Sequence, residues 1–143
     1  MVGFTPEKSV QTDRGEEVMK THTTGEIMDL DPCKDWPIAR VSAIVKDGLT
    51  KMQILEHHRI SDSDKVWVVW NLLGKADEWV AAEESALFAY DVAYNMAWDA
   101  AREAGEAGVV NAAFVAGKRA KKAVWAEEVK RLKLVVRELE GER

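Results

Sequence analysis

The second half of the chain limits the possible folds most, because residues 77–140 have the pattern of two long, alanine-rich helices. Apolar residues recur at three- and four-residue spacings, which places them on one face of a helix. Gly105 and Gly108 mark the break between the helices. We therefore expect an antiparallel hairpin, with helices over residues 77–104 and 110–140. Small residues would let its axes approach closely, with Ala97, Ala101 and Ala104 facing Ala113, Gly117 and Ala120.

Shorter helices are predicted in the first half. One follows Asp35 with Pro37 in its first turn and stops at Gly48, and a second is capped by Thr50. A third begins among the capping residues 61–64 and ends at Gly74. It is apolar on most sides, so Trp67 and Trp70 should lie at the centre of the protein.

The expected fold class is therefore all-α, with about five helices. Residues 1–30 are polar and aperiodic, and they predict an extended N-terminal arm or a disordered tail, of which residues 27–30 are best suited to dock on the body. Residues 31–143 would form one all-helical domain, in which a short-helix cluster (31–75) packs on the long hairpin (76–143).

Charge is distributed unevenly along the chain. The formal net charge is -5, but residues 118–137 hold eight basic residues against two acidic ones. Residues 77–107 hold eight acidic residues against Arg102. The two long helices should therefore attract each other, and the net acidity argues against nucleic acid as the principal partner. With one cysteine and no long apolar run, the chain is expected to be cytoplasmic and not bound to a membrane.

Several segments resemble a family of small, uncharacterised helical proteins of tailed phages and prophages, which has immunity-like relatives. The similar segments are residues 33–36, 49–58, the capped, tryptophan-rich segment 63–75, the alanine- and aromatic-rich tract at 81–101, and the basic segment 118–137. The chain differs from the family near His57 and His58, where a cysteine is usual, and in its shorter alanine tract. The resemblance implies a role in phage–host or toxin–immunity conflict, and it assigns no functional residue.

No residue pattern predicts catalysis or a cofactor. His57 and His58 are adjacent, so their side chains diverge on a helix and cannot share one metal ion; Cys33 has no third residue to complete a nucleophilic site. Glu84, Asp91 and Asp99 fit a solvated helix face. We therefore expect no metal, no cofactor and no enzymatic activity.

A basic stripe is the best candidate for a partner-binding surface. It consists of Arg119, Lys122, Lys130, Lys133 and Arg137 at helical spacing, and Trp125 is added as a candidate contact residue. The stripe could bind an acidic protein face or a phosphate backbone, or it could simply be solvated. The leading hypothesis is a non-enzymatic module that binds a host or phage protein. Such a module could act as an inhibitor in the conflict between a phage and the defences of its host. The alternative is a nucleic-acid-binding module, and a second copy of the chain is a further candidate partner.

Overall fold

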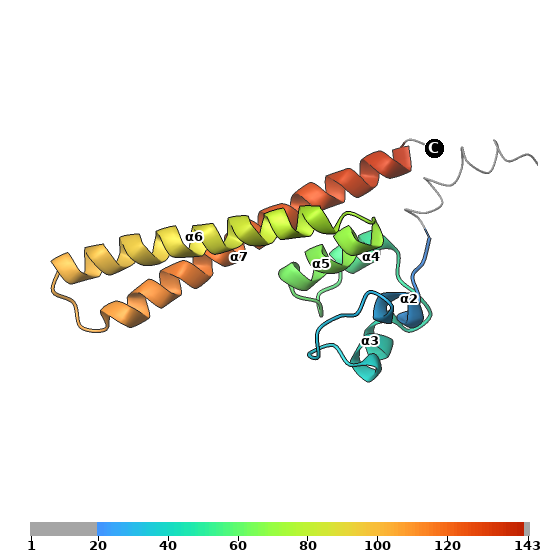
Figure 1. Ribbon diagram of the computed structural model, residues 1–143, viewed down its shortest axis with the longest axis horizontal. Helices are drawn as coiled ribbons and strands as arrows, with labels where there is room; N and C mark the ends of the chain where they lie inside the picture. Colours follow the sequence, from blue (N-terminus) through green and yellow to red (C-terminus); the bar gives the residue numbers. More distant parts are fainter. Residues whose placement is uncertain (1–19, 142–143) are drawn as a thin grey trace, which may run out of the picture.

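The computed structural model describes residues 20–141, and within this range the fold is all-α, as the sequence predicts. Figure 1 shows two long helices packed side by side, with the short helices gathered near one end of the pair. No strand occurs among the described residues. The six helices are α2 (Thr24–Met28), α3 (Ile38–Val45), α4 (Lys51–Leu55), α5 (Asp62–Leu72), α6 (Ala76–Glu103) and α7 (Val109–Gly141).

Side-chain caps explain where the short helices begin. Thr50 and Gln53 form a capping box at the start of α4, and the Ser61 hydroxyl accepts the Asp64 backbone N–H at the start of α5. Both predicted caps are confirmed. Pro37 is the N-cap residue of α3, one position earlier than predicted. The predicted break between the long helices is also confirmed, since Gly105 and Gly108 adopt positive φ angles of 69° and 78°.

The first described residues are not a detached tail, in contrast to the prediction for residues 1–30. His22 and Leu49 exchange backbone hydrogen bonds of 2.7 and 3.2 Å, and α2 follows at once. Ile27 is buried, as expected for a docking residue, and residues 1–19 lie outside the described part of the chain. At Gly48, whose φ is 131°, a Cβ would lie 3.0 Å from the Thr21 side chain, so this junction requires glycine.

A buried polar network holds this junction. Lys51 Nζ lies 3.0 Å from His22 Nε2, and His22 Nδ1 lies 3.1 Å from a Glu26 carboxylate oxygen. This arrangement fits a neutral imidazole that accepts from the ammonium and donates to the carboxylate. Lys20 lies 3.5 Å from the same carboxylate. Burial and the neighbouring Lys51 charge lower the pKa of His22, against the opposing effect of Glu26.

The core forms around α7. Leu132 and Val136 are fully buried, and Trp70 of α5 packs in the same cluster with 2% of its surface exposed. The Trp70 indole N–H donates to Glu128 at 3.0 Å, and Arg131 bonds to Glu128 and Glu78, which ties α5, α6 and α7 together. Trp70 is thus central, as predicted. The prediction for Trp67 is wrong, because this residue is only half-buried.

The register of the hairpin differs from the predicted seam of small residues. Gly117 is buried, but it packs under the ring of Tyr90 rather than against alanines of α6. A Cβ at this position would lie 2.7–2.9 Å from three atoms of that ring. Ala101 and Ala113 are buried as predicted, whereas Ala104 is exposed. The close approach of the two helices therefore accommodates an aromatic ring.

We predict that Gly117→Leu destabilises the protein by about 1–3 kcal/mol, the usual cost of overpacking, even though leucine favours a helix more than glycine does. The Tyr90 ring cannot easily move aside, because it also contacts Tyr94 and Phe114. Ala112→Leu, at a half-buried position of the same helix, is the control and should change the melting temperature much less. Similar melting temperatures for the two variants would contradict the packing of Gly117 against Tyr90.

We also predict that the free energy of unfolding falls as the pH drops from about 7 through 6.5. Because the folded-state pKa of His22 lies below its ordinary value of 6.5, the unfolded chain takes up this proton first, and protonation favours unfolding. The pKa of Glu26 is lowered mainly by its bond to His22, so stability should fall further below its ordinary pKa of 4.5. Urea unfolding at several pH values measures both effects.

The control for this prediction is His57→Gln, because burial also lowers the pKa of His57. The variant should keep most of the loss of stability near pH 6.5. A pH-independent free energy of unfolding between pH 7 and 5, or a dependence abolished by His57→Gln, would show that His22 does not control it.

Candidate interaction surfaces

The outer part of the α6–α7 pair, residues 87–123, is here named the distal hairpin. The buried core cluster ends at Ala86 on α6, and its nearest members on α7 are Val124 and Trp125. Beyond these residues Figure 1 shows only the two helices, which extend away from α2–α5. Each helix of the distal hairpin therefore has one packing neighbour and leaves most of its surface uncovered.

Large apolar side chains are concentrated on this uncovered surface. Of the ten large hydrophobic residues that are exposed among the described residues, seven belong to the distal hairpin. Scattered exposed hydrophobic residues are normal in proteins, but a contiguous apolar patch usually marks an interaction site. The seven residues are Leu87, Phe88, Val92, Met96, Val110, Phe114 and Val115.

An aromatic cluster runs along one side of the distal hairpin. Tyr94 stacks on Trp98 with 6.2 Å between ring centroids, and Phe114 of α7 meets Tyr94 edge-on at 6.0 Å. Leu87 precedes Tyr94 by seven residues, so it lies on the same side of α6 as Tyr94. Val110 precedes Phe114 by four residues, so it lies on the same side of α7 as Phe114. We name this surface the aromatic flank; it comprises Leu87, Tyr94, Trp98, Val110 and Phe114.

The polar edge of the aromatic flank is charged. Lys118 Nζ lies 5.5 Å from the centre of the Phe114 ring, within the range of a cation–π contact. Asp91 is exposed four residues after Leu87 and three before Tyr94. A second apolar row, the outer stripe, consists of Phe88, Val92 and Met96 at four-residue spacing.

The basic stripe lies at the surface, as its spacing predicts. Arg119, Lys122, Lys130 and Arg137 are exposed and Lys133 is half-buried. Within the described range, Lys130 is the one member with an ion pair, to Glu127 at 3.2 Å. The acidic residues of α6 that could have paired with the stripe do not; Glu78 pairs with Arg131, which lies outside it. The stripe is therefore a solvated cationic surface.

Trp125 is not part of this surface. It has 6% of its surface exposed and stacks on Trp79 at 5.0 Å between ring centroids. The prediction that Trp125 contacts a partner is wrong for this structure, because its ring is used in the core. Among the aromatic residues of the distal hairpin, Phe88 and Phe114 are exposed, and Tyr94 and Trp98 are half-buried.

The other sequence candidates are not brought together into a reactive site. The rings of His57 and His58 stack at 5.5 Å, and His57 Nδ1 accepts the Arg59 backbone N–H. Cys33 is exposed in a different loop, and the acidic residues Glu84, Asp91 and Asp99 are exposed on α6. Across residues 20–141, no group of three or more histidine, cysteine or acidic side chains is placed to hold a metal ion.

Comparison of the chain with protein-family models, with curated proteins and with solved structures finds no match. None of the helices in the described part of the chain has the length and apolar character needed to cross a membrane.

Proposed function

We propose that this protein is a non-enzymatic interaction module that binds another protein through the aromatic flank of its distal hairpin. The observation that carries the proposal is the concentration of seven large exposed hydrophobic residues, three of them on the aromatic flank, on a part of the molecule that contributes no residue to the main core cluster. Burying such a surface against a partner is favourable by about 25 cal/mol per Å² of apolar area removed from water.

The composition of the aromatic flank suits a protein partner. Tryptophan and tyrosine are the residues most often found at energetic centres of protein interfaces, and this surface offers Trp98 and Tyr94. Tyr94 stacks on Trp98 and meets Phe114 edge-on, and these contacts fix the positions of the rings before binding, which lowers the entropy lost on association. Lys118 and Asp91 at the edge would add charge complementarity and set the orientation of the partner.

The resemblance to small phage and prophage proteins supports a partner encoded by a host or a phage, bound in the cytoplasm. In this proposal the module acts as an inhibitor or immunity-like protein, because covering a partner's surface requires no chemistry of its own. A second copy of the chain is a further candidate for the same surface, and sedimentation of the purified protein distinguishes this case.

A nucleic-acid-binding module is the second candidate function. The observation in its favour is that four members of the basic stripe are exposed over nearly five turns of α7. The net charge of -5 and the pairing of Lys130 with Glu127 weaken it. The aromatic flank is also a poor match for a duplex, since Lys118 is the one basic residue that contacts its rings among the described contacts.

We predict that Phe114→Ala weakens binding of the partner by about 2 kcal/mol, or roughly thirtyfold, as truncation at an interface hot spot does. Phe88→Ala, the same change on the outer stripe, is the matched control and should have less than a fivefold effect. The partner is first isolated on the immobilised full chain from a lysate of the native source and identified. Its affinity for each variant is then measured by titration calorimetry.

Two results would decide against this proposal. If Phe88→Ala weakens binding and Phe114→Ala does not, the contact lies on the outer stripe and not on the aromatic flank. If neither change affects a partner that binds the parent, the distal hairpin is not the contact surface. Thermal melts of both variants confirm that the helices remain folded.

The basic stripe is tested separately. We predict that replacing Lys130, Lys133 and Arg137 together by Glu leaves the fold intact, because exposed ion pairs contribute only about 0–1 kcal/mol each. Neither the parent nor the variant should bind DNA or RNA at physiological salt in a mobility-shift assay. A submicromolar, salt-sensitive complex with the parent that the triple change abolishes would establish the nucleic-acid function instead.

A further inference from the structure

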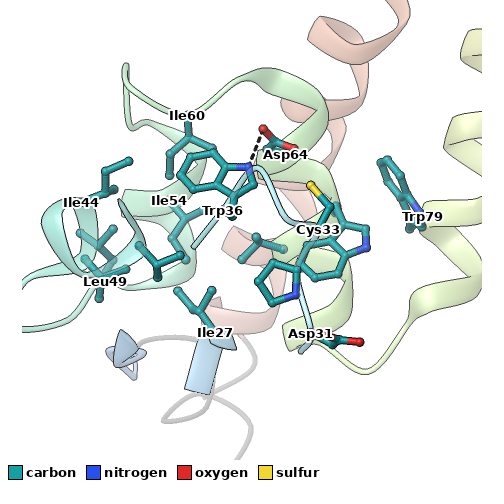
Figure 2. Close-up of a pocket in the computed structure, with 15 residues that line it drawn as sticks. Ile27, Asp31, Cys33, Trp36, Ile44, Leu49, Ile54, Ile60, Asp64 and Trp79 are labelled. Atoms are coloured by element: carbon teal, nitrogen blue, oxygen red, sulfur yellow. Dashed lines mark hydrogen bonds between the residues drawn. The ribbon is translucent and has the colours of Figure 1, made fainter. Parts of the chain in front are cut away.

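A separate cavity lies inside the cluster of short helices. It has a volume of about 370 Å³ and lies where α2 and α3 face α4, α5 and the first turns of α6. Figure 2 shows the side chains around it, with Ile27, Ile44, Ile54 and Ile60 on one side and Trp79 on the other. The loop that carries Asp31 and Cys33 forms part of its wall, and both residues are exposed, so the cavity is open to solvent there.

The size of the cavity is that of a binding site rather than a packing defect. Protein interiors contain few voids larger than a water molecule, and small-molecule sites occupy roughly 300–1,000 Å³. The cavity explains why Trp67 is only half-buried, because its side chain lines the empty space instead of filling the core. A ligand that restored the missing contacts would stabilise the folded protein.

The chemistry of the lining identifies the kind of ligand. Eleven of the fifteen lining residues are aliphatic or carry an indole ring. The eight aliphatic ones are Ile27, Val41, Ile44, Val45, Leu49, Ile54, Ile60 and Val68, and the indoles belong to Trp36, Trp67 and Trp79. Such a surface binds an apolar body, and the indole faces of Trp67 and Trp79 can also attract a cation. The Trp36 ring already carries the Arg40 guanidinium, 3.9 Å from its centre.

The charged groups of the lining are all negative. Asp31 and Asp64 contribute carboxylates, and no lysine, arginine or histidine is among the lining residues. Asp64 accepts hydrogen bonds from the Trp36 indole N–H at 3.0 Å and from the Ser61 hydroxyl at 2.8 Å, which fixes its carboxylate at the cavity wall (Figure 2). Fixed negative charge beside an apolar surface favours a cation and disfavours an anion.

We propose that this cavity binds a small organic cation with an apolar body, such as an arylalkylamine. The body lies against the aliphatic side chains and indoles, and the ammonium group lies near the Asp31 carboxylate at the open side. The site is remote from the aromatic flank, so this inference does not depend on the proposed function.

The test uses three probes of similar size that share a phenyl ring on a four-carbon chain: 4-phenylbutylamine, 4-phenylbutanol and 4-phenylbutyrate. Binding to the full chain is followed by the rise in melting temperature and by titration of the tryptophan indole N–H signals in NMR spectra. We expect the amine to bind with a Kd of about 0.1–1 mM, at least tenfold tighter than the alcohol, and the carboxylate not to bind.

Two pairs of variants locate the site. Val68→Phe should fill the cavity and abolish binding, whereas Val92→Phe, the same change on the exposed outer stripe, should not affect it. Asp31→Asn should weaken the amine about tenfold and leave the alcohol unchanged. Asn is a suitable replacement because Asp31 has a φ of 59°, a conformation that Asn tolerates well.

Three results would overturn the proposal. Absence of binding by all three probes would show that the cavity is not a ligand site. Equal affinity for amine and alcohol would show that the carboxylates do not select a cation. Binding that survives Val68→Phe in a variant with a normal melting temperature would place the ligand elsewhere on the protein.

Discussion

One apolar row on α7 holds the protein together. Trp125, Val129, Leu132 and Val136 are buried in succession along this helix, and α4, α5 and the first half of α6 pack against them. Trp70 joins the row from α5 and is secured by its bond to Glu128, one residue before Val129. The row and the main core cluster both end at Trp125, and the part of α7 that precedes this residue has only α6 beside it.

This division separates stability from recognition. The row on α7 and the cluster around it supply most of the buried apolar surface. Exposed side chains of the distal hairpin can therefore be replaced without unfolding the body. The distal hairpin is held by interlocking rings and by Gly117 under Tyr90, contacts that involve two helices only. Surfaces that bind partners are often placed in such a way, on an extension of a stable scaffold.

Local signals predicted most of the fold. The caps at Thr50 and Ser61 and the glycines at 105 and 108 fix helix ends through interactions within a few residues, so they can be read from the sequence. The bridge between His22 and Leu49 joins residues far apart in the sequence, and no local pattern reveals it. The hairpin register was also missed, because alanine spacing alone did not show that Gly117 accommodates the ring of Tyr90.

The candidate site was predicted only in part. The spacing of the basic stripe correctly placed it at the surface. Trp125 was misassigned, because an aromatic residue beside a charged row can point either into the core or toward solvent. The aromatic flank was missed since Tyr94 follows the same spacing as true core residues. One signal was present in the sequence: Phe88, Val92 and Met96 form a second apolar row on α6, and a single neighbouring helix cannot cover two.

The stacked pair Trp79–Trp125 has a mechanical consequence. It lies where the distal hairpin leaves the body, and Trp79 also lines the cavity, so one indole touches both the root of the hairpin and the cavity wall. From residue 87 to the end of α6 the helix extends for about 25 Å at 1.5 Å per residue. A tilt of about 5° at the root would therefore displace the tip by about 2 Å, roughly half the width of an aromatic contact. In this geometry a small repacking beside the Trp79–Trp125 pair is magnified at the far end of the distal hairpin.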